Sequence, residues 1–412
     1  MRSIRNGTGT EGSCGVSRGR RLPLLGVTLG AALAMAGLSA AAGSDDPASV
    51  PGDPLNGVLT ELEPAIERAM LDGNIPSLTM ALVDGEEIIW SGGFGKSNRW
   101  ARTPAVPGTV YIVASTLKPQ ATFALLQLHE HGRFQLDDPV SDHLGGLEIG
   151  GEDPDDPITF RHLLTHTSGL PTAYTSMRLW DHEVPMSPRE YLEDVEVEGP
   201  PMERVRYSNP GYTLIAHLIE EMTDRDFRDV VREEVWEPLG MDGMAFRPDG
   251  ALEERLAQPY APAGNDGGLR PVSRTRFHEW PAGGAYGTVE DQARFLAVNL
   301  TGGIYDGRRL LEEETVDRMH TRQFQRFAGP MRAGWGGEDA GYGLTWWTSE
   351  DGAGHRIFAH SGSIQGYTAF LHGNRDRQLG VAILTNGNRA HDHLVELSEL
   401  ATELMTRHLR AD

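Results

Sequence analysis

Ser115 lies three residues before Lys118, which is one of only two lysines in the sequence. This spacing limits the local structures that the segment can adopt. Ser115 and Lys118 stand just before residues 121–129, which have apolar residues at helical spacing and no glycine. Residues i and i+3 share one face at the start of a helix, so the Lys118 ammonium can lie over the Ser115 hydroxyl. A serine needs such a neighbouring base or cation to act as a nucleophile, and a helix N-terminus favours a developing oxyanion.

Lysine is scarce in this sequence, where Lys96 and Lys118 are the only two and every other cationic side chain is arginine. An arginine cannot lose its proton under ordinary conditions, whereas a lysine amine can. The scarcity therefore favours a chemical role for Lys118. The alternative is an ordinary surface lysine in a first helical turn.

The first 42 residues have the pattern of a signal peptide. Five arginines, Arg2, Arg5, Arg18, Arg20 and Arg21, precede an apolar run over residues 22–42 that ends in Ala40-Ala41-Ala42, a cleavage candidate. Residues 43–53 follow as a polar leader. The run is also long enough to span a bilayer, so an N-terminal membrane anchor is the alternative. We expect export to the periplasm or outside the cell, and Arg20-Arg21 allows a twin-arginine route.

Charge and cysteine content exclude several kinds of partner and site. Removing the five arginines and Glu11 with the signal peptide changes the net charge from -22 to -26, which argues against nucleic acid and anionic membranes as partners. Cys14, the single cysteine, would leave with that segment, so no disulfide or thiolate site is expected. His162 and His166 are four residues apart, but no Glu follows His162 as a metalloprotease helix needs. We expect no metal and no cofactor.

Strand patterns lie near both ends of the chain, with helical patterns between them. Residues 78–83 and 87–90 form a predicted hairpin around Asp84-Gly85, and residues 367–372 and 379–385 form a second pair of strands. A final helix is predicted over residues 391–409.

Three further segments are assigned from periodicity alone. Residues 55–71 read as a helix that Pro64 kinks or that begins after Pro64. Residues 178–201 predict a polar helix followed by a loop, and residues 252–281 predict an irregular loop. The roughly 370 residues after the signal peptide suffice for two domains or one large one.

Two more motifs carry groups that suit acyl-transfer chemistry. Tyr207-x-Asn209 places a phenol and an amide side by side in a turn before an apolar helix. A phenol beside a cation has a lowered pKa, so Tyr207 near Lys118 could act as a base. His360-x-Gly362 brings a titratable ring and an unobstructed backbone to a strand edge. Each motif taken singly also fits a structural tyrosine or histidine.

Taken in order, Ser-x-x-Lys, Tyr-x-Asn and His-x-Gly resemble the motifs of the serine β-lactamase and penicillin-binding protein superfamily. The resemblance is to the class C-like branch with D-aminopeptidases, DD-carboxypeptidases and β-lactamase-like esterases, and it covers residues 54–408. It implies an α/β (α+β) fold in which both chain ends build an antiparallel sheet flanked by helices. The α/β part would comprise about 54–120 and 288–408, with a mainly helical part over about 121–287.

The resemblance also implies a role for each motif residue. Ser115 would be the acylated nucleophile, and Lys118 would activate it through its charge or as a proton acceptor. Tyr207 would act as base in acylation and help to deliver water in deacylation, while Asn209 would orient the substrate. The backbone N–H groups of Ser115 and Ser363 would form the oxyanion hole.

His360 departs from the β-lactamase pattern, which has a lysine there to help bind the carboxylate of the drug. The resemblance therefore favours a small ester, an amide or a D-amino-acid peptide as substrate over a β-lactam. Gly362 would leave room for that substrate. A non-catalytic protein that binds or senses peptidoglycan or β-lactams is the alternative from another functional class.

Overall fold

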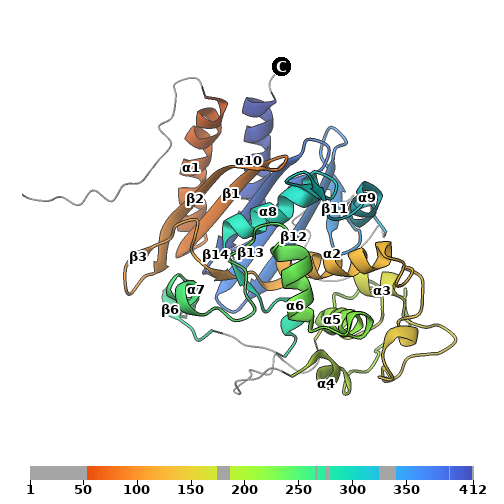
Figure 1. Cartoon of the computed structure of the whole chain (residues 1–412). Coiled ribbons are helices and arrows are strands. Elements are labelled where there is room, and N and C mark those ends of the chain that lie inside the picture. The colour runs from red at the N-terminus through yellow and green to blue at the C-terminus, as the bar shows by residue number, and fades with distance from the viewer. Residues whose placement is uncertain are drawn as a thin grey trace, which may run out of the picture. The chain divides into compact units, whose positions relative to one another are not determined.

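The computed structural model describes residues 53–173, 186–264, 268–274, 278–323, 340–388 and 390–410, so the predicted signal peptide lies outside the described residues. A sheet of eight strands in the order β10-β11-β12-β13-β14-β1-β2-β3 forms its centre, and each neighbouring pair is antiparallel (Figure 1). Its strands are β1 (Ser77–Asp84), β2 (Glu87–Asn98), β3 (Thr103–Pro104), β10 (Gly341–Tyr342), β11 (Trp347–Glu350), β12 (Arg356–Ile364), β13 (Tyr367–Asn374) and β14 (Leu379–Thr385). The two ends of the chain thus build one sheet, which confirms the predicted fold class.

Helices cover this sheet and fill the middle of the chain. They are α1 (Pro54–Asp72), α2 (Leu117–Glu130), α3 (Phe160–Leu164), α4 (Pro188–Leu192), α5 (Asn209–Thr223), α6 (Phe227–Val231), α7 (Gly250–Glu254), α8 (Val289–Leu300), α9 (Glu313–His320) and α10 (His391–Leu409). Short helical turns are η1 (Ala114–Thr116), η2 (Val140–His143), η3 (Arg232–Trp236) and η4 (Trp280–Ala282). Three small ribbons pair β4 (Tyr111–Ile112) with β7 (Tyr286–Gly287), β5 (Tyr260–Pro262) with β6 (Leu269–Pro271), and β8 (Ile304–Tyr305) with β9 (Arg308–Arg309).

The central strands are buried on both faces, because alternate side chains pack into two different hydrophobic cores. On β1, Ala81 and Val83 belong to the core that includes α2, α5 and α8. Met80 and Leu82, which alternate with these two residues along the strand, belong to the core under α1 and α10. This alternation is the period of two expected of a strand, and it explains why β1 reads as a nearly continuous apolar run.

Helix α1 runs without a break from Pro54 to Asp72 and contains Pro64. The prediction that this helix begins after Pro64 is therefore wrong. The Asp53 side chain accepts a hydrogen bond from the Leu55 N–H and fixes the first turn. Leu62 and Ile66, on either side of Pro64, are fully buried against the sheet. Their burial compensates for the backbone hydrogen bond that a proline cannot make.

Two other assignments from periodicity are corrected. Within the described part of residues 178–201, the helix is only the five-residue α4, which a Ser187 and Glu190 capping box starts; residues 174–185 lie outside the described residues. The predicted irregular loop over 252–281 contains the β5–β6 ribbon and the turn η4. Short elements of this kind lack enough residues to show a period.

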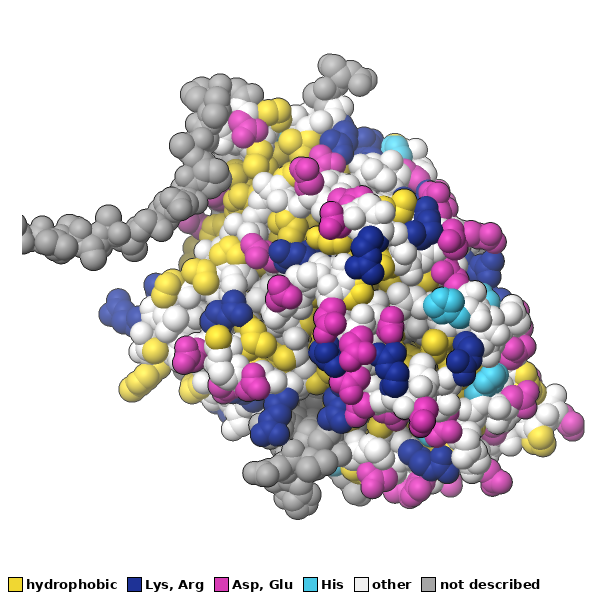
Figure 2. All heavy atoms as spheres, in the orientation of Figure 1, with side chains coloured by type: hydrophobic (Ala, Val, Ile, Leu, Met, Phe, Trp, Pro, Cys, Tyr) yellow, Lys and Arg dark blue, Asp and Glu magenta, His cyan; other side chains and the backbone are white. Residues whose placement is uncertain are grey.

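Exposed charges of both signs are interleaved on the surface over α6 and η3, where Figure 2 shows them together. Arg225 pairs with Glu233 and Glu234, and Arg232 pairs with Asp229 and Glu237. Exposed pairs of this type contribute little stability individually.

Candidate active site

Ser115 lies in the turn η1, which directly precedes helix α2 and packs against strands β12 and β13. Ala114 has a backbone φ of 49°, in the left-handed region that an L-residue other than glycine rarely adopts. The turn is held because the Val113 N–H donates to the Ala285 carbonyl at 2.9 Å. Strain of this kind is common where a fold must present one side chain to a site.

Lys118 is fully buried in the first turn of α2, and its amine reaches the serine as the spacing predicted. Its Nζ lies 2.9 Å from Ser115 Oγ and donates to the Ala282 carbonyl at 2.6 Å. It also lies over the ring of Tyr207, 4.8 Å from the centroid. Burial lowers the pKa of Lys118 to about 7, against the opposing charge of Glu279. An amine that loses its proton near neutral pH can accept one from a hydroxyl.

Tyr207 lies just before the N-cap of α5, and Lys118 Nζ lies 4.8 Å from the centroid of its ring. The Ser208 side chain caps α5 by accepting from the Gly211 N–H, which fixes the turn that carries Tyr207. Burial raises the pKa of Tyr207 well above its ordinary value. The predicted lowering of the Tyr207 pKa is therefore wrong, because desolvation of a phenolate outweighs a nearby amine that is itself half-deprotonated.

Asn209 is the first residue of α5, two positions after Tyr207, and it is half-buried. Its backbone N–H donates to the Thr172 carbonyl at 3.0 Å, which ties the start of α5 to the loop after α3. The role of its side chain toward a substrate stays a prediction.

Strand β12 brings its free edge to the nucleophile. Its pairing with β11 ends at Ala359, so residues 360–364 pair only with β13 among the described strands. A Cβ on Gly362 would lie 2.8 Å from the Ser115 nitrogen and 2.6 Å from the Val113 carbonyl oxygen, so only glycine fits there.

The N–H of Ser363 is directed away from β13 by the geometry of the hairpin. Gln365 and Gly366 form a two-residue turn, so Ile364 and Tyr367 are the closing, hydrogen-bonded pair. Alternation in an antiparallel ladder makes the next pair, Ser363 with Thr368, a non-bonded one. The Ser363 N–H therefore points away from β13, and its pairing with the Ser115 N–H in an oxyanion hole stays a prediction.

His360 is buried, with 1% of its surface exposed, and its Nδ1 lies 2.8 Å from the Ser361 carbonyl. A ring nitrogen facing a carbonyl carries the proton, so Nε2 is left as an acceptor. Burial, reinforced by the charge of Lys118, lowers the pKa of His360 to about 3. Burial therefore favours the neutral form of His360 near pH 7, and its role toward a substrate stays a prediction.

Two residues near the site were not identified as functional from the sequence. His166 is buried, and its ring is tilted by 41° to that of Tyr207 with the centroids 4.3 Å apart. Its Nδ1 accepts from the Ser208 N–H at 3.1 Å. His162 instead caps its own helix, so the two histidines do not converge, and the described residues contain no cluster of three metal-ligating side chains. Glu279, the second residue, lies in a stretch without any recognisable motif.

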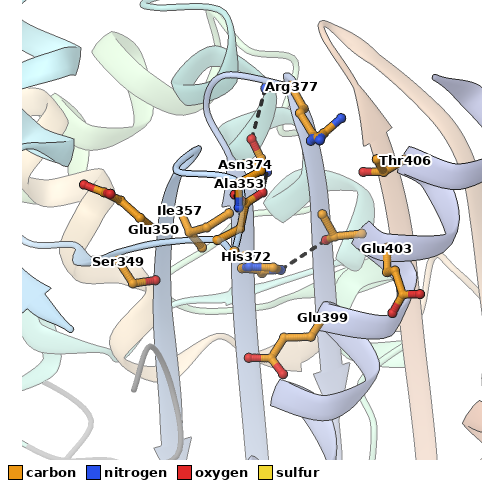
Figure 3. A pocket seen from close by; sticks show the side chains of 13 residues that line it. Ser349, Glu350, Ala353, Ile357, His372, Asn374, Arg377, Glu399, Glu403 and Thr406 are labelled. Atoms are coloured by element: carbon orange, nitrogen blue, oxygen red, sulfur yellow. Dashed lines mark hydrogen bonds between the residues drawn. The ribbon is translucent and has the colours of Figure 1, made fainter. Parts of the chain in front are cut away.

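A cavity of about 380 Å³ lies elsewhere, between the β11–β13 part of the sheet and α10. Figure 3 shows His372, Asn374 and Glu399 around it, with none of the candidate catalytic residues in its lining. His372 is held there by Thr402 of α10, with Nδ1 and Oγ1 3.2 Å apart. This cavity is therefore separate from the Ser115 site.

Comparisons with known proteins agree with this fold. A family model described as Beta-lactamase matches residues 62–404. Protein flp of Staphylococcus aureus (strain MW2) is 24% identical over 359 residues, which cover 85% of this chain and 67% of that protein.

Two solved structures have a similar fold. One is a beta-lactamase/D-alanine carboxypeptidase from Yersinia pestis complexed with citrate, with a TM-score of 0.69 and 20% identity over 85% of this chain and 99% of the other. The second is EstCE1, a hydrolase with promiscuous acyltransferase activity, with a TM-score of 0.70 and 18% identity over 84% of this chain and 98% of the other.

Proposed function

The chain belongs to the Beta-lactamase family, and from this premise we propose that it is an exported serine hydrolase that forms an acyl-enzyme on Ser115. One observation carries the proposal most directly. The buried Lys118 amine lies 2.9 Å from Ser115 Oγ and has its pKa lowered to about 7, so the nucleophile has a proton acceptor in contact with it. A positioned general base contributes typically about 10²–10⁴-fold in rate.

Acylation begins with the proton of Ser115 passing to the neutral amine of Lys118. Ser115 Oγ then forms a bond to the substrate carbonyl carbon, and the carbonyl oxygen becomes an oxyanion facing the N–H groups of Ser115 and Ser363. The bond to the leaving group breaks as the leaving alkoxide takes the proton of the Tyr207 hydroxyl. Tyr207 regains a proton from the Lys118 ammonium, because its raised pKa makes it the preferred proton carrier.

Deacylation repeats these steps with water as the nucleophile. The amine of Lys118, through Tyr207, takes a proton from water as the hydroxide oxygen bonds to the acyl carbon. The acyl–oxygen bond to Ser115 then breaks, and the Ser115 oxygen takes its proton from the Lys118 ammonium, which returns the amine to its neutral form. Asn209, at the start of α5, would orient the substrate beside Tyr207.

The substrate class that fits this site best is an ester with an uncharged acyl group. Among the described motif residues His360 is neutral and Lys118 is only partly charged near pH 7, so neither would offer a substrate carboxylate a full positive charge. Hydrolysis of amides or D-amino-acid peptides is the second candidate. It is supported by the likeness in fold to the Yersinia pestis beta-lactamase/D-alanine carboxypeptidase.

Export is part of the proposal and rests on the sequence of residues 1–42. The described residues contain no helix that is long and apolar enough to cross a membrane.

Labelling with a fluorescent fluorophosphonate tests the acyl-enzyme. We expect the wild-type protein to be labelled and the Ser115→Ala variant to remain unlabelled. Circular dichroism checks that both proteins are folded. Equal labelling of the two proteins, or no labelling of either, would support the non-catalytic alternative. A short-chain p-nitrophenyl ester, a D-Ala-D-Ala peptide and a chromogenic cephalosporin, tested side by side, then rank the substrate classes, and the ester should be cleaved fastest.

A further inference from the structure

The segment that follows helix α3, residues 166–172, is a backbone template for the loop that carries Tyr207. Four N–H groups of the loop donate to carbonyls of the segment: Glu198 to Gly169 at 2.9 Å, Met202 to Thr167 at 2.8 Å, Arg206 to His166 at 2.7 Å and Asn209 to Thr172 at 3.0 Å. Two of these hydrogen bonds flank Tyr207, one directly before it and one two residues after it. The loop is thereby fixed up to the first residue of α5.

His166 contacts the chain on both sides of Tyr207. Its carbonyl accepts from the Arg206 N–H, and its ring nitrogen Nδ1 accepts from the Ser208 N–H at 3.1 Å. Its ring also lies against the ring of Tyr207, with the centroids 4.3 Å apart. One residue thus holds the backbone before and after the tyrosine as well as the tyrosine ring.

The residue type at position 166 has to meet two requirements. Its backbone φ is 58°, in the left-handed region where asparagine, aspartate and histidine are enriched among residues other than glycine. The Ser208 N–H can only donate, so Nδ1 is the acceptor and Nε2 carries the proton of the neutral ring. Nε2 is buried and has no hydrogen-bond partner among the described residues. An apolar side chain would avoid that cost, so the acceptor at Nδ1 is the reason to retain a histidine.

We propose that His166 is a positioning residue for Tyr207, which it holds in place by accepting the Ser208 N–H at Nδ1. This rests on the proposed function, in which Tyr207 passes protons between Lys118 and the leaving group. Lys118 Nζ lies 4.8 Å from the centroid of the Tyr207 ring, so a shift of the turn moves the phenol relative to the amine. A misplacement of about 1 Å can lower a rate about 100-fold.

Nuclear magnetic resonance of the full chain, labelled with ¹⁵N in histidine and serine, tests this hydrogen bond without a substrate. Near pH 7 we expect His166 Nδ1 to have the chemical shift of an unprotonated nitrogen and a scalar coupling to the Ser208 amide nitrogen. The His166 signals are assigned by their loss in His166→Asn. A protonated Nδ1, or no coupling to Ser208, would overturn the proposal whether or not Ser115 forms an acyl-enzyme.

Two substitutions separate the acceptor from the ring. Asparagine tolerates the left-handed backbone and has an oxygen in the place of Nδ1, whereas phenylalanine keeps a ring but has no acceptor. His166→Phe should lower kcat for the p-nitrophenyl ester about 100-fold with little change in KM. His166→Asn should recover much of that loss. Equal kcat values in the two variants, whether high or low, would contradict the role of the acceptor.

His162→Phe is the matched control, because His162 Nδ1 also accepts from a backbone N–H, that of Thr159 at 3.2 Å, in the cap of α3. This variant should keep the kcat of wild type, and a loss as large as that of His166→Phe would overturn the assignment.

A double substitution tests whether His166 acts through the tyrosine. In a Tyr207→Phe background, His166→Phe should cause no further loss of rate, since the hydroxyl that it positions is already absent. A loss of the same size in both backgrounds would show a merely structural role.

Discussion

At Lys118, the requirements of stability and chemistry oppose each other. The pKa of its amine is lowered from 10.5 to about 7 on folding. Between these two values the unfolded chain binds a proton that the folded protein does not, so the free energy of unfolding rises with pH across this window. The buried amine therefore destabilises the fold near neutral pH, as is common for residues retained for function.

Replacing Lys118 should separate these two effects. Lys118→Met and Lys118→Arg should both lower turnover by at least about 100-fold, because methionine has no base and arginine does not release its proton. The stability of Lys118→Met relative to wild type should decline by roughly 3 kcal/mol between pH 7 and pH 10, as wild type gains stability. Urea unfolding at several pH values measures this, and a pH-independent difference would show that the amine is not buried in a neutral form.

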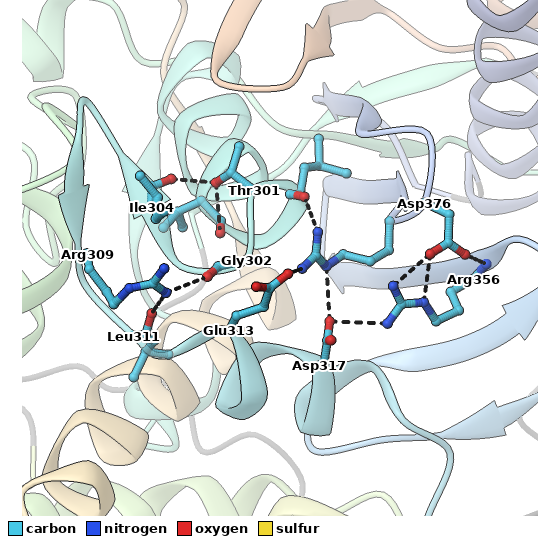
Figure 4. Close-up of polar contacts among 12 residues, drawn as sticks. Thr301, Gly302, Ile304, Arg309, Leu311, Glu313, Asp317, Arg356 and Asp376 are labelled. Carbon is cyan, nitrogen blue, oxygen red and sulfur yellow. Dashed lines mark hydrogen bonds and ion pairs between the residues drawn. The ribbon is translucent and has the colours of Figure 1, made fainter.

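At the scale of elements, one buried arginine joins a helix pair to the sheet. This residue is Arg375, which follows β13 and has 5% of its side chain exposed. Figure 4 shows its acidic partners Glu313 and Asp317, with Arg356 on the other side of Asp317. Arg375 Nη1 donates to the Leu300 carbonyl at the end of α8 at 2.6 Å, and the guanidinium pairs with Glu313 and Asp317 of α9. Arg356, at the start of β12, pairs with Asp376 and Asp317, but 42% of its side chain is exposed.

The two arginines in this network should differ in their contribution to stability. Arg375→Met should lower the free energy of unfolding by about 2–3 kcal/mol, because it leaves the buried Leu300 carbonyl without this donor and removes one cation from Glu313 and Asp317. Arg356→Met, the exposed control, should cost less than about 1 kcal/mol. Urea denaturation of the two variants and wild type makes the comparison, and equal losses would contradict the importance assigned to burial.

Long elements, in which the apolar pattern repeats several times, could be predicted from the sequence, and short elements could not. The hairpins near residues 78–90 and 367–385 follow from alternating apolar residues that the sheet uses on both faces. The start of α1 was misjudged at Pro64, since packing of Leu62 and Ile66 decides that helix rather than its propensity. Helix α4, with five residues, contains too little pattern to locate.

At the scale of the whole molecule, buried histidines make the fold sensitive to acid. Burial lowers the pKa of His360 to about 3 and of His372 to about 4, and it holds those of His166 and His320 well below 6.5. The unfolded chain takes up these protons near pH 6.5, whereas the folded protein does not. Their contribution to stability is therefore present above about pH 6.5 and is lost as the pH falls toward 4.

His372 allows this sensitivity to be tested away from the candidate site. Its depressed pKa accounts for roughly 1.4 kcal/mol per pH unit within that window. Between pH 7 and pH 4.5, His372→Gln should thus lose about 2 kcal/mol less stability than wild type. The exposed His131→Gln is the matched control and should behave as wild type. Thermal or urea unfolding at both pH values gives the result, and identical acid sensitivity in all three proteins would refute the assignment.

The sequence by itself determined the residue types, their spacing and the local periodicity, and these sufficed for the sheet built from both ends and for the three motifs. Ser115 with Lys118 could be paired in advance because three residues span one helical turn. Only the tertiary structure decided the protonation states of Lys118, Tyr207 and His360, and only it brought the Ala282 carbonyl to the Lys118 amine. The reason is physical: a pKa depends on desolvation and on nearby charges, and both arise when segments far apart in the chain pack around the group.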